Sequence, residues 1–407
     1  MKYFKNTELA KIYNVSEKSV RNWIQAARDG KLDLQLYEKN GKNYIGDTSK
    51  NTALITQLVE RGKKYKNTRS YKVVRPTDKF YKLYSAEQIL DIISGLEIYR
   101  EIPRQYNYFD GGAEYWDKYV KRLATEETPN ILNSTLKLLD VNQDYLDFLL
   151  NNYKRVNVID VGAGNAWPIK KLLSHLIDEQ KLGRYIALDI SSQMLKIAEK
   201  NIAEWFGDKV HFEGKALDIN YDRFSSVIAN EYMTKEGKDT INIVIVFGGT
   251  IGNLRSPDGA FKVIHDSMGR KDLLIHAIKL DTEATRRYFD FSADAQLQPL
   301  APQYKFIVDL LNIDPSYYEV EMGYDQVHSH RFLRIRLKVA LTINFDFDGI
   351  ERSVDLNKDD AILMWRYVHQ DMFATLDQLK RTEFHPLHAS LTDDGEYLLS
   401  ISRINSL

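Results

Sequence analysis

The sequence predicts an α/β fold, in which a Rossmann-like doubly wound sheet is joined by an α+β substrate or lid domain and preceded by a small basic domain. Three observations predict it. Residues 156–167 run from an apolar strand into a turn with two glycines. Residues 185–190, 210–218 and 241–247 supply further short apolar strands. Residues 1–79 carry 18 Lys and Arg against 8 Asp and Glu, which sets the front apart from the acidic remainder.

Composition limits the function classes. A chain of 407 residues with 43% hydrophobic residues is long enough for two or three folded domains. It contains no cysteine, which excludes disulfides, thiolate metal sites and cysteine nucleophiles. No opening segment resembles a signal peptide, and no apolar run reaches the roughly 20 residues that cross a bilayer. We therefore expect a cytoplasmic protein without a membrane partner.

The basic front has helix-turn-helix spacing. Asn6 or Thr7 can cap a helix that ends at Ile12, a turn follows at Asn14-Val15, and Ser16 can cap a second helix that continues to Arg28. With Val20, Trp23 and Ile24 packed inward, the second helix exposes a polar and basic face: Lys18, Arg21, Asn22, Gln25 and Arg28.

A hairpin follows these helices. Residues 34–37 and 42–45 flank Asn40-Gly41, a pair typical of tight hairpin turns. Helix, turn, helix and hairpin together resemble the winged modules of the MerR and excisionase families, and this resemblance implies DNA as a partner of residues 1–68. The alternative is an interaction or dimerisation module without nucleic acid, so a homodimer stays open.

The glycine-rich turn predicts a nucleotide-type cofactor site. Gly162 permits a tight turn after a strand that contains Asp160, and Gly164 allows a ligand to approach the backbone. Trp167 stands where the third glycine of a dinucleotide fingerprint belongs. Asp189 and Asp218 end the next two strands, and a carboxylate in the first of these positions can accept both ribose hydroxyls.

The spacing of Asp160, Asp189 and Asp218 resembles that of class I methyltransferases. This resemblance implies S-adenosylmethionine as the cofactor, with Asp189 at the ribose and Asp218 beside the adenine. The candidate cofactor-binding residues are Asp160, Gly162, Ala163, Gly164, Asp189, Ile190, Asp218, Ile219, Gly248 and Gly249.

Residues 246–254 read Val-Phe-Gly-Gly-Thr-Ile-Gly-Asn-Leu and resemble a signature of the histidine-specific Nα-methyltransferases of ergothioneine biosynthesis. Residues 108–116 resemble a second segment of that family. The resemblance implies that Asn253 holds the amino group of the acceptor. It also implies a lid from residues 69–128 and 281–368, around a cofactor domain of residues 129–280 and 369–407.

The sequence departs from this family where histidine would bind. Trp365 and Tyr367 stand at the positions of the Glu-x-Ser motif that binds imidazole in the family. We therefore expect an acceptor amine other than histidine, an amino acid or a derivative, next to Trp365 and Tyr367. Asn253 is the first candidate for the catalytic site, and Tyr108 and Tyr106 are the second.

Alternatives to a small-molecule enzyme stay open. A nucleic-acid methyltransferase would use the front module to deliver its substrate, but the cysteine of cytosine-C5 transfer and the Pro-Pro motif of exocyclic-amine transfer are both missing. A regulator that senses the cofactor and binds DNA is the third class.

Two further expectations concern the second half of the chain. His328 and His330 lie two residues apart, but no further ligand stands at a helpful spacing, so we expect no metal. Residues 332–343 predict an exposed edge strand and residues 396–402 a final strand of the main sheet.

Overall fold

The computed structural model describes residues 3–13, 15–68, 71–109, 111–232, 238–289 and 296–404. Asn14 of the predicted turn and Asp110 lie outside these residues. The chain divides into two compact units, residues 1–73 with 340–342 and residues 74–339 with 343–407. The predicted division of the second unit into a lid and a cofactor domain stays a prediction.

The first unit contains the predicted helices and hairpin. Helices α1 (Asn6–Ile12) and α2 (Glu17–Arg28) precede strands β2 (Leu36–Lys39) and β3 (Lys42–Gly46), and β1 (Tyr3–Phe4) pairs with β3. The Ser16 hydroxyl accepts the amide of Ser19, which caps α2 as expected. Asn40 and Gly41 both have positive φ angles, 48° and 69°, as a tight hairpin turn requires. A long helix, α3 (Ser49–Thr68), follows.

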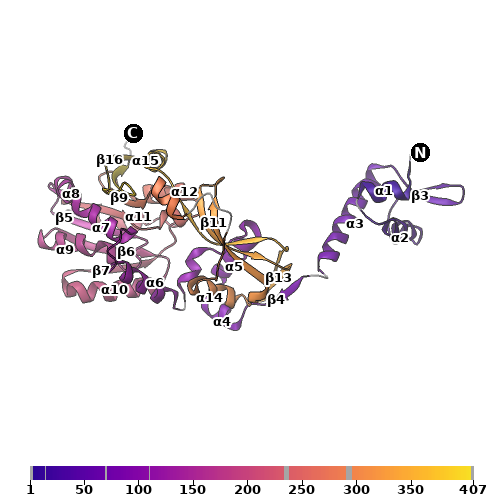
Figure 1. Ribbon diagram of the computed structural model, residues 1–407, viewed down its shortest axis with the longest axis horizontal. Helices are drawn as coiled ribbons and strands as arrows, with labels where there is room; N and C mark the ends of the chain where they lie inside the picture. The colour runs from indigo at the N-terminus through magenta and orange to yellow at the C-terminus, as the bar shows by residue number, and fades with distance from the viewer. Residues whose placement is uncertain are drawn as a thin grey trace. The chain divides into compact units, whose positions relative to one another are not determined.

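The second unit is built on a seven-stranded sheet (Figure 1). Its order is β16-β17-β9-β8-β5-β6-β7. The five parallel strands are β5 (Arg155–Val161), β6 (Leu182–Asp189), β7 (Phe212–Ala216), β8 (Thr240–Val246) and β9 (Leu273–Lys279). Strands β16 (Phe384–Leu391) and β17 (Tyr397–Ile404) run antiparallel, with β17 next to β9. The predicted return of the chain end to the sheet is confirmed.

Helices cover both faces of this sheet. One apolar cluster joins the sheet to α7 (Ile131–Val141), α8 (Gln143–Leu150), α9 (Lys170–Asp178) and α10 (Ser192–Phe206). A second cluster, on the opposite face, joins it to α11 (Ser225–Tyr232), α12 (Pro257–Ser267) and α15 (Met372–Arg381). Burial on both faces explains why these strands are continuous apolar runs, since a parallel sheet with helices on both sides exposes neither face. The carboxyl ends of β5 and β8, where the strand order reverses, form the switch point at which ligands bind in such sheets.

A helical segment precedes the seven-stranded sheet in the chain and is bound to a strand of a second, smaller sheet. It contains α4 (Asp78–Leu83), α5 (Ala86–Ser94), a π-helix η1 (Gly95–Tyr99), a 3-10 helix η2 (Arg104–Tyr108) and α6 (Gly112–Leu123). Backbone hydrogen bonds tie it to β15 (Ala361–Val368): the amide of Ile102 donates to the Leu363 carbonyl, and the amide of Leu363 to the Arg100 carbonyl. Strand β15 thus fixes the start of η2.

Two small sheets follow, and the first of them is antiparallel. One has the order β10-β11-β12-β15 and contains β10 (Gln296–Leu297), β11 (Tyr318–Asp325) and β12 (His330–Leu337). The other has the order β14-β13-β4 and contains β14 (Ile350–Leu356), β13 (Leu341–Phe347) and β4 (Lys72–Val74). Helices α13 (Glu283–Phe289) and α14 (Pro302–Leu310) complete the elements. Among the described helices, none is both long and apolar enough to span a membrane.

The prediction of an exposed edge strand over residues 332–343 is wrong. Strand β12 lies between β11 and β15, ends at Leu337, and is followed by a separate strand, β13. Its arginines suggested an edge, but Arg334 and Arg336 both pair with Glu321 on the neighbouring strand β11. Cross-strand ion pairs therefore allow this charged strand to lie inside a sheet.

Candidate active site

The loop after β5 turns at two glycines. Gly162 and Gly164 have φ angles of 72° and 55°, a left-handed conformation that side chains disfavour. The Gly162 amide donates to the Leu188 carbonyl at 2.8 Å, which anchors the loop to β6. A Cβ atom on Gly162 would lie 2.7 Å from Oγ1 of Thr250, in the loop after β8. The tight turn predicted at Gly162 is confirmed, and it also serves the close approach of two loops.

Asp189 stands at the carboxyl end of β6 and is held by backbone amides. Its Oδ2 accepts from the Gly164 amide at 3.0 Å and its Oδ1 from the Ser191 amide at 2.9 Å. Burial raises the pKa of Asp189, and the two amides oppose that rise. Each carboxylate oxygen keeps a further lone pair. The side chain is therefore fixed at the glycine loop and can still accept two hydroxyl groups.

Asp160 lies within the sheet and is 4% exposed. The Tyr185 hydroxyl donates to its Oδ2 at 3.1 Å. Burial raises the pKa of Asp160 to about 7, although the Tyr185 hydrogen bond lowers it. The structure thus gives this predicted cofactor-binding residue a partner on the neighbouring strand β6.

Asp218 follows β7, and its Oδ1 accepts both the backbone amide and the side-chain amide of Asn220, at 2.9 and 2.8 Å. Burial raises the pKa of Asp218, and Asn220 opposes the rise. Ile219 is buried in the apolar cluster below, and Ile190 is partly buried directly after Asp189. The predicted adenine-side residues thus all lie at the ends of β6 and β7.

Asn253 lies in a 3-10 turn, η6 (Ile251–Asn253), after β8. The Trp365 indole N–H donates to its Oδ1 at 2.9 Å. Because an indole nitrogen can only donate, this bond fixes which end of the carboxamide is oxygen. A Cβ atom on Gly249 would lie 3.0 Å from Asn253 Nδ2, so Gly249 admits the amide. Gly248 has a φ of 70° and makes the preceding turn.

Tyr367 lies on the same strand as Trp365 and packs against the loop after β8. Cβ atoms on Gly249 and Gly252 would lie 3.1 and 3.0 Å from its ring. The rings of Trp365 and Tyr367 are stacked at a centroid distance of 6.4 Å. Burial raises the pKa of Tyr367. The structure therefore brings the three predicted acceptor-side residues, Asn253, Trp365 and Tyr367, together.

The two candidate tyrosines of η2 differ in surroundings. The Tyr106 hydroxyl donates to Asp91 Oδ2 at 2.8 Å, and its ring is buried against Tyr84. Tyr108 instead lies with Trp116, at a centroid distance of 6.1 Å. Burial raises the pKa of Tyr108, Arg104 lowers it, and Asp189 raises it further. Both tyrosines thus lie near candidate cofactor-binding carboxylates: Asp189 raises the pKa of Tyr108, and Asp218, after burial and Asp91, raises that of Tyr106.

Three further residues contact the site, and although they lie in segments that the sequence analysis singled out, it assigned them no role. Trp116 Nε1 would lie 3.7 Å from a Cβ on Gly164, so the indole of α6 borders the glycine loop. Asn165 Nδ2 donates to Asp117 Oδ1 at 2.8 Å and ties α6 to the same loop. Thr250 faces Gly162. None of these contacts follows from spacing, because each joins segments that are distant along the chain.

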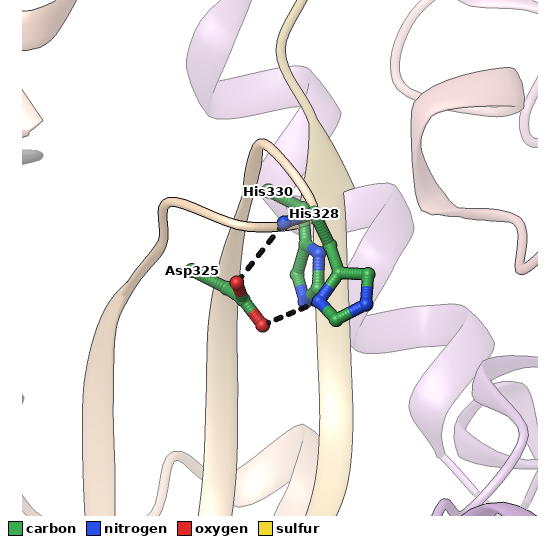
Figure 2. Close-up of side chains that lie close together, drawn as sticks. All are labelled: Asp325, His328 and His330. Carbon is green, nitrogen blue, oxygen red and sulfur yellow. Dashed lines mark hydrogen bonds and ion pairs between the residues drawn. The ribbon is translucent and has the colours of Figure 1, made fainter.

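His328 and His330 gain a neighbour that the sequence did not indicate (Figure 2). Asp325, His328 and His330 place ligand-type atoms within 4.8 Å of one another. Asp325 is the cross-strand partner of His330, and its Oδ2 lies 2.9 Å from Nδ1 of His328. Its Oδ1 accepts the amides of Val327 and His328. These bonds close the β11–β12 hairpin. The expectation that no third ligand-type residue lies near the two histidines is therefore wrong, and the prediction of no metal stays a prediction.

The sheet order, the glycine loop after β5 and the acidic residues of β5, β6 and β7 together define a class I, Rossmann-like methyltransferase. Within this class the chain belongs to the SAM-dependent histidine-specific methyltransferase family, which matches residues 88–365. The protein is therefore a SAM-dependent methyltransferase and S-adenosylmethionine is its cofactor. The lone pairs left on Asp189 fit the ribose of this cofactor.

The chain is also similar to solved methyltransferase structures, at low sequence identity and low TM-score. A SAM-dependent methyltransferase from Clostridium acetobutylicum is 11% identical with a TM-score of 0.39, and the match covers 74% of this chain and 99% of that one. The CcbJ methyltransferase from Streptomyces caelestis is 10% identical with a TM-score of 0.39, and covers 74% and 98%. A comparison with curated proteins finds no match.

Proposed function

We propose that the protein methylates the amino nitrogen of a small molecule, an amino acid or derivative other than histidine. The observation that carries this proposal is the Asn253 carboxamide, which Trp365 holds in place in the loop after β8. Trp365 uses one lone pair of Oδ1, and the second can accept an amine N–H. A neutral amide orients the amine without an ion pair, which would stabilise the unreactive ammonium form.

The cofactor supplies an activated methyl group on a sulfonium. The amine nitrogen forms the new N–C bond as the S–C bond breaks, the positive charge passes to nitrogen, and a proton then leaves to water. Asn253 aligns the lone pair of the amine for this step, and alignment is the larger part of such catalysis. The rings of Trp365 and Tyr367 lie beside it and favour the cation that forms.

Histidine fits this acceptor side poorly. In place of the Glu and Ser that bind an imidazole in the family, β15 presents Trp365 and Tyr367, so the carboxylate that would pair with an imidazole is missing. The only polar hydrogen of the Trp365 side chain is already donated to Asn253. An aromatic pair of this kind favours a flat or apolar group on the acceptor.

Calorimetry and turnover test this proposal together. The wild type, saturated with S-adenosylhomocysteine, is titrated with a panel of amino acids and amines, and turnover is followed with labelled cofactor. Asn253→Ala should keep S-adenosylhomocysteine affinity and lose turnover by about a hundredfold. Asn344→Ala, in the separate β13 strand, is the control and should change neither. Full turnover of Asn253→Ala, or methylation at an atom other than nitrogen, would refute the proposal.

A second candidate function belongs to residues 1–68. We infer that this unit binds DNA as a winged helix-turn-helix module. Lys18, Arg21, Asn22, Gln25 and Arg28 are all exposed on α2, as the sequence predicts. An open hollow beside this helix and the hairpin is lined by the cations Lys5, Arg21, Arg28 and Lys42. Exposed cations on one helix and the adjoining hairpin match the phosphate contacts that such modules make.

Salt dependence and sequence preference separate DNA recognition from general attraction. Binding of labelled duplexes by the full chain is measured over a salt series. Arg21→Gln is the test variant. Lys50→Gln is the control, because Lys50 lies outside α2 and pairs with Asp33. We expect Arg21→Gln to lower the salt slope by about one. Methyl transfer to the duplex would support the nucleic-acid methyltransferase, and DNA binding that changes with cofactor would support the sensing regulator. Absence of binding at low salt would leave an interaction module.

A further inference from the structure

We infer that Arg104 binds a carboxylate at the methyl-transfer site, and this inference rests on the proposed function. Arg104 begins η2, four residues before Tyr108, and is partly buried. Its guanidinium carbon lies 5.8 Å from the ring centre of Tyr108 and 5.5 Å from that of Trp116. Burial lowers the pKa of Arg104, and the Tyr108 hydroxyl is among the groups that raise it. Two aromatic groups therefore hold a permanent cation within the site.

Arg104 differs from the other arginines nearby because it lacks an acidic partner. Arg100, on the same segment, pairs with Asp360 at 3.2 Å, and Arg255 pairs with Glu101 at 3.3 Å. Over the part of the chain that the structure describes, no carboxylate lies within ion-pair distance of Arg104. A partly buried charge without a carboxylate counter-ion is costly. Burial lowers the pKa of Arg104, but the neighbouring tyrosines, Tyr108 first, raise it by more, so the guanidinium keeps its charge. A ligand that supplies the anion removes that cost.

The position of Arg104 joins the two sides of the site. On the cofactor side, Trp116 borders Gly164. Burial raises the pKa of Tyr108, Arg104 lowers it, and Asp189 raises it further. On the acceptor side, Arg104 lowers the pKa of Tyr367, which burial raises. Arg104 also influences the pKa of Tyr304 on α14. The guanidinium thus lies on Trp116, which borders the loop after β5, and it acts electrostatically on Tyr367, which packs against the loop after β8.

The chemistry of the ligand follows from the guanidinium. Its planar fork binds a carboxylate through two parallel N–H···O bonds, while its faces stack on aromatic rings. Two ligands of this enzyme can bring a carboxylate: the amino-acid end of S-adenosylmethionine, and an amino-acid acceptor. In both cases the specificity is for an α-amino acid group.

The experiment compares the wild type with Arg104→Gln and Arg104→Lys in the full chain. The cofactor arm measures affinity for S-adenosylhomocysteine and for methylthioadenosine, which lacks the amino-acid part. The acceptor arm, on protein saturated with S-adenosylhomocysteine, measures affinity for amino acids and their decarboxylated amines, such as tyrosine with tyramine. Arg122→Gln is the matched control, because Arg122 also stacks on an aromatic ring, Tyr119, but pairs with Glu126 on the surface.

We expect Arg104→Gln to weaken carboxylate binding about tenfold or more in one arm, with Arg104→Lys intermediate because it keeps the charge but not the fork. A loss for S-adenosylhomocysteine with unchanged methylthioadenosine affinity assigns Arg104 to the cofactor. A lost preference for amino acids over their amines assigns it to the acceptor. The inference would be overturned if affinity fell equally for S-adenosylhomocysteine and methylthioadenosine, or if affinity did not fall in either arm. Methylation at an atom other than nitrogen would refute the proposed function. The cofactor arm would still show whether Arg104 binds the carboxylate of the cofactor.

Discussion

The two sides of the active site are encoded differently. On the proposed cofactor side, Asp160 and Asp189 lie on two consecutive strands and Asp218 follows the third, and the bonds that hold them are made to the same or adjoining strands and loops. On the acceptor side, Asn253 is held by Trp365, 112 residues further along the chain. A local strand-loop-helix pattern therefore specifies the cofactor side, whereas the acceptor side depends on how distant segments pack.

The largest expected effect is on the cofactor side. Asp189→Ala removes the carboxylate that can accept two ribose hydroxyls, and two charge-assisted hydrogen bonds contribute ~4 kcal/mol, or about a thousandfold in affinity. Calorimetric titration with S-adenosylhomocysteine measures it. Asp208→Ala, an exposed carboxylate in η4 (Gly207–Lys209), is the control and should bind as the wild type does. Unchanged binding by Asp189→Ala would mean that the glycine loop does not hold the cofactor.

Asp160 should make the stability of the sheet depend on pH. Its pKa in the folded protein is raised to about 7 from an ordinary value of 3.8. Between these two values the folded state binds more protons than the unfolded state, so the free energy of unfolding falls as pH rises. The loss is on the order of 3 kcal/mol across this window. Urea unfolding of Asp160→Asn from pH 4 to 8 should show a smaller decline than the wild type, and parallel curves would refute the shift.

Gly162→Ala should distort the junction of the two loops. The new Cβ would lie 2.7 Å from Thr250 Oγ1, in addition to the strain of a φ of 72°. Gly207→Ala is the control, since Gly207 has a φ of 55° and no heavy atom within 4 Å of an added Cβ. We expect unfolding free energies lower by ~1 kcal/mol for the control and ~3 kcal/mol for Gly162→Ala. The double variant with Thr250→Ala should recover part of the difference; equal losses in both single variants would show that the contact is unimportant.

This contrast explains what the sequence could predict. Glycine turns and the cap at Ser16 depend on a few adjacent residues, and the structure has them where they were expected. Boundaries were less exact: Asp218 lies two residues beyond the end of β7, and the N-cap of α1 is Lys5 instead of Asn6 or Thr7. The bond between Trp365 and Asn253 could not be predicted, because a residue pattern contains no information on which distant side chains meet. The surroundings of Arg104 could not be predicted for the same reason. The charges of β12 indicated an edge strand, because the sequence does not show that Glu321 on β11 pairs with them.

The smallest expected effect tests the acceptor side alone. Trp365→Phe keeps an aromatic ring but removes the N–H that donates to Asn253 Oδ1 at 2.9 Å. The carboxamide can then rotate, so turnover should fall about tenfold, equivalent to ~1.4 kcal/mol, while S-adenosylhomocysteine affinity stays the same. Trp205→Phe, on α10 beside Trp167, is the matched control and should turn over at the wild-type rate. If Trp365→Phe instead weakens cofactor binding, the two sides of the site are coupled through the loop after β8. If it changes neither quantity, the indole does not position Asn253 for catalysis.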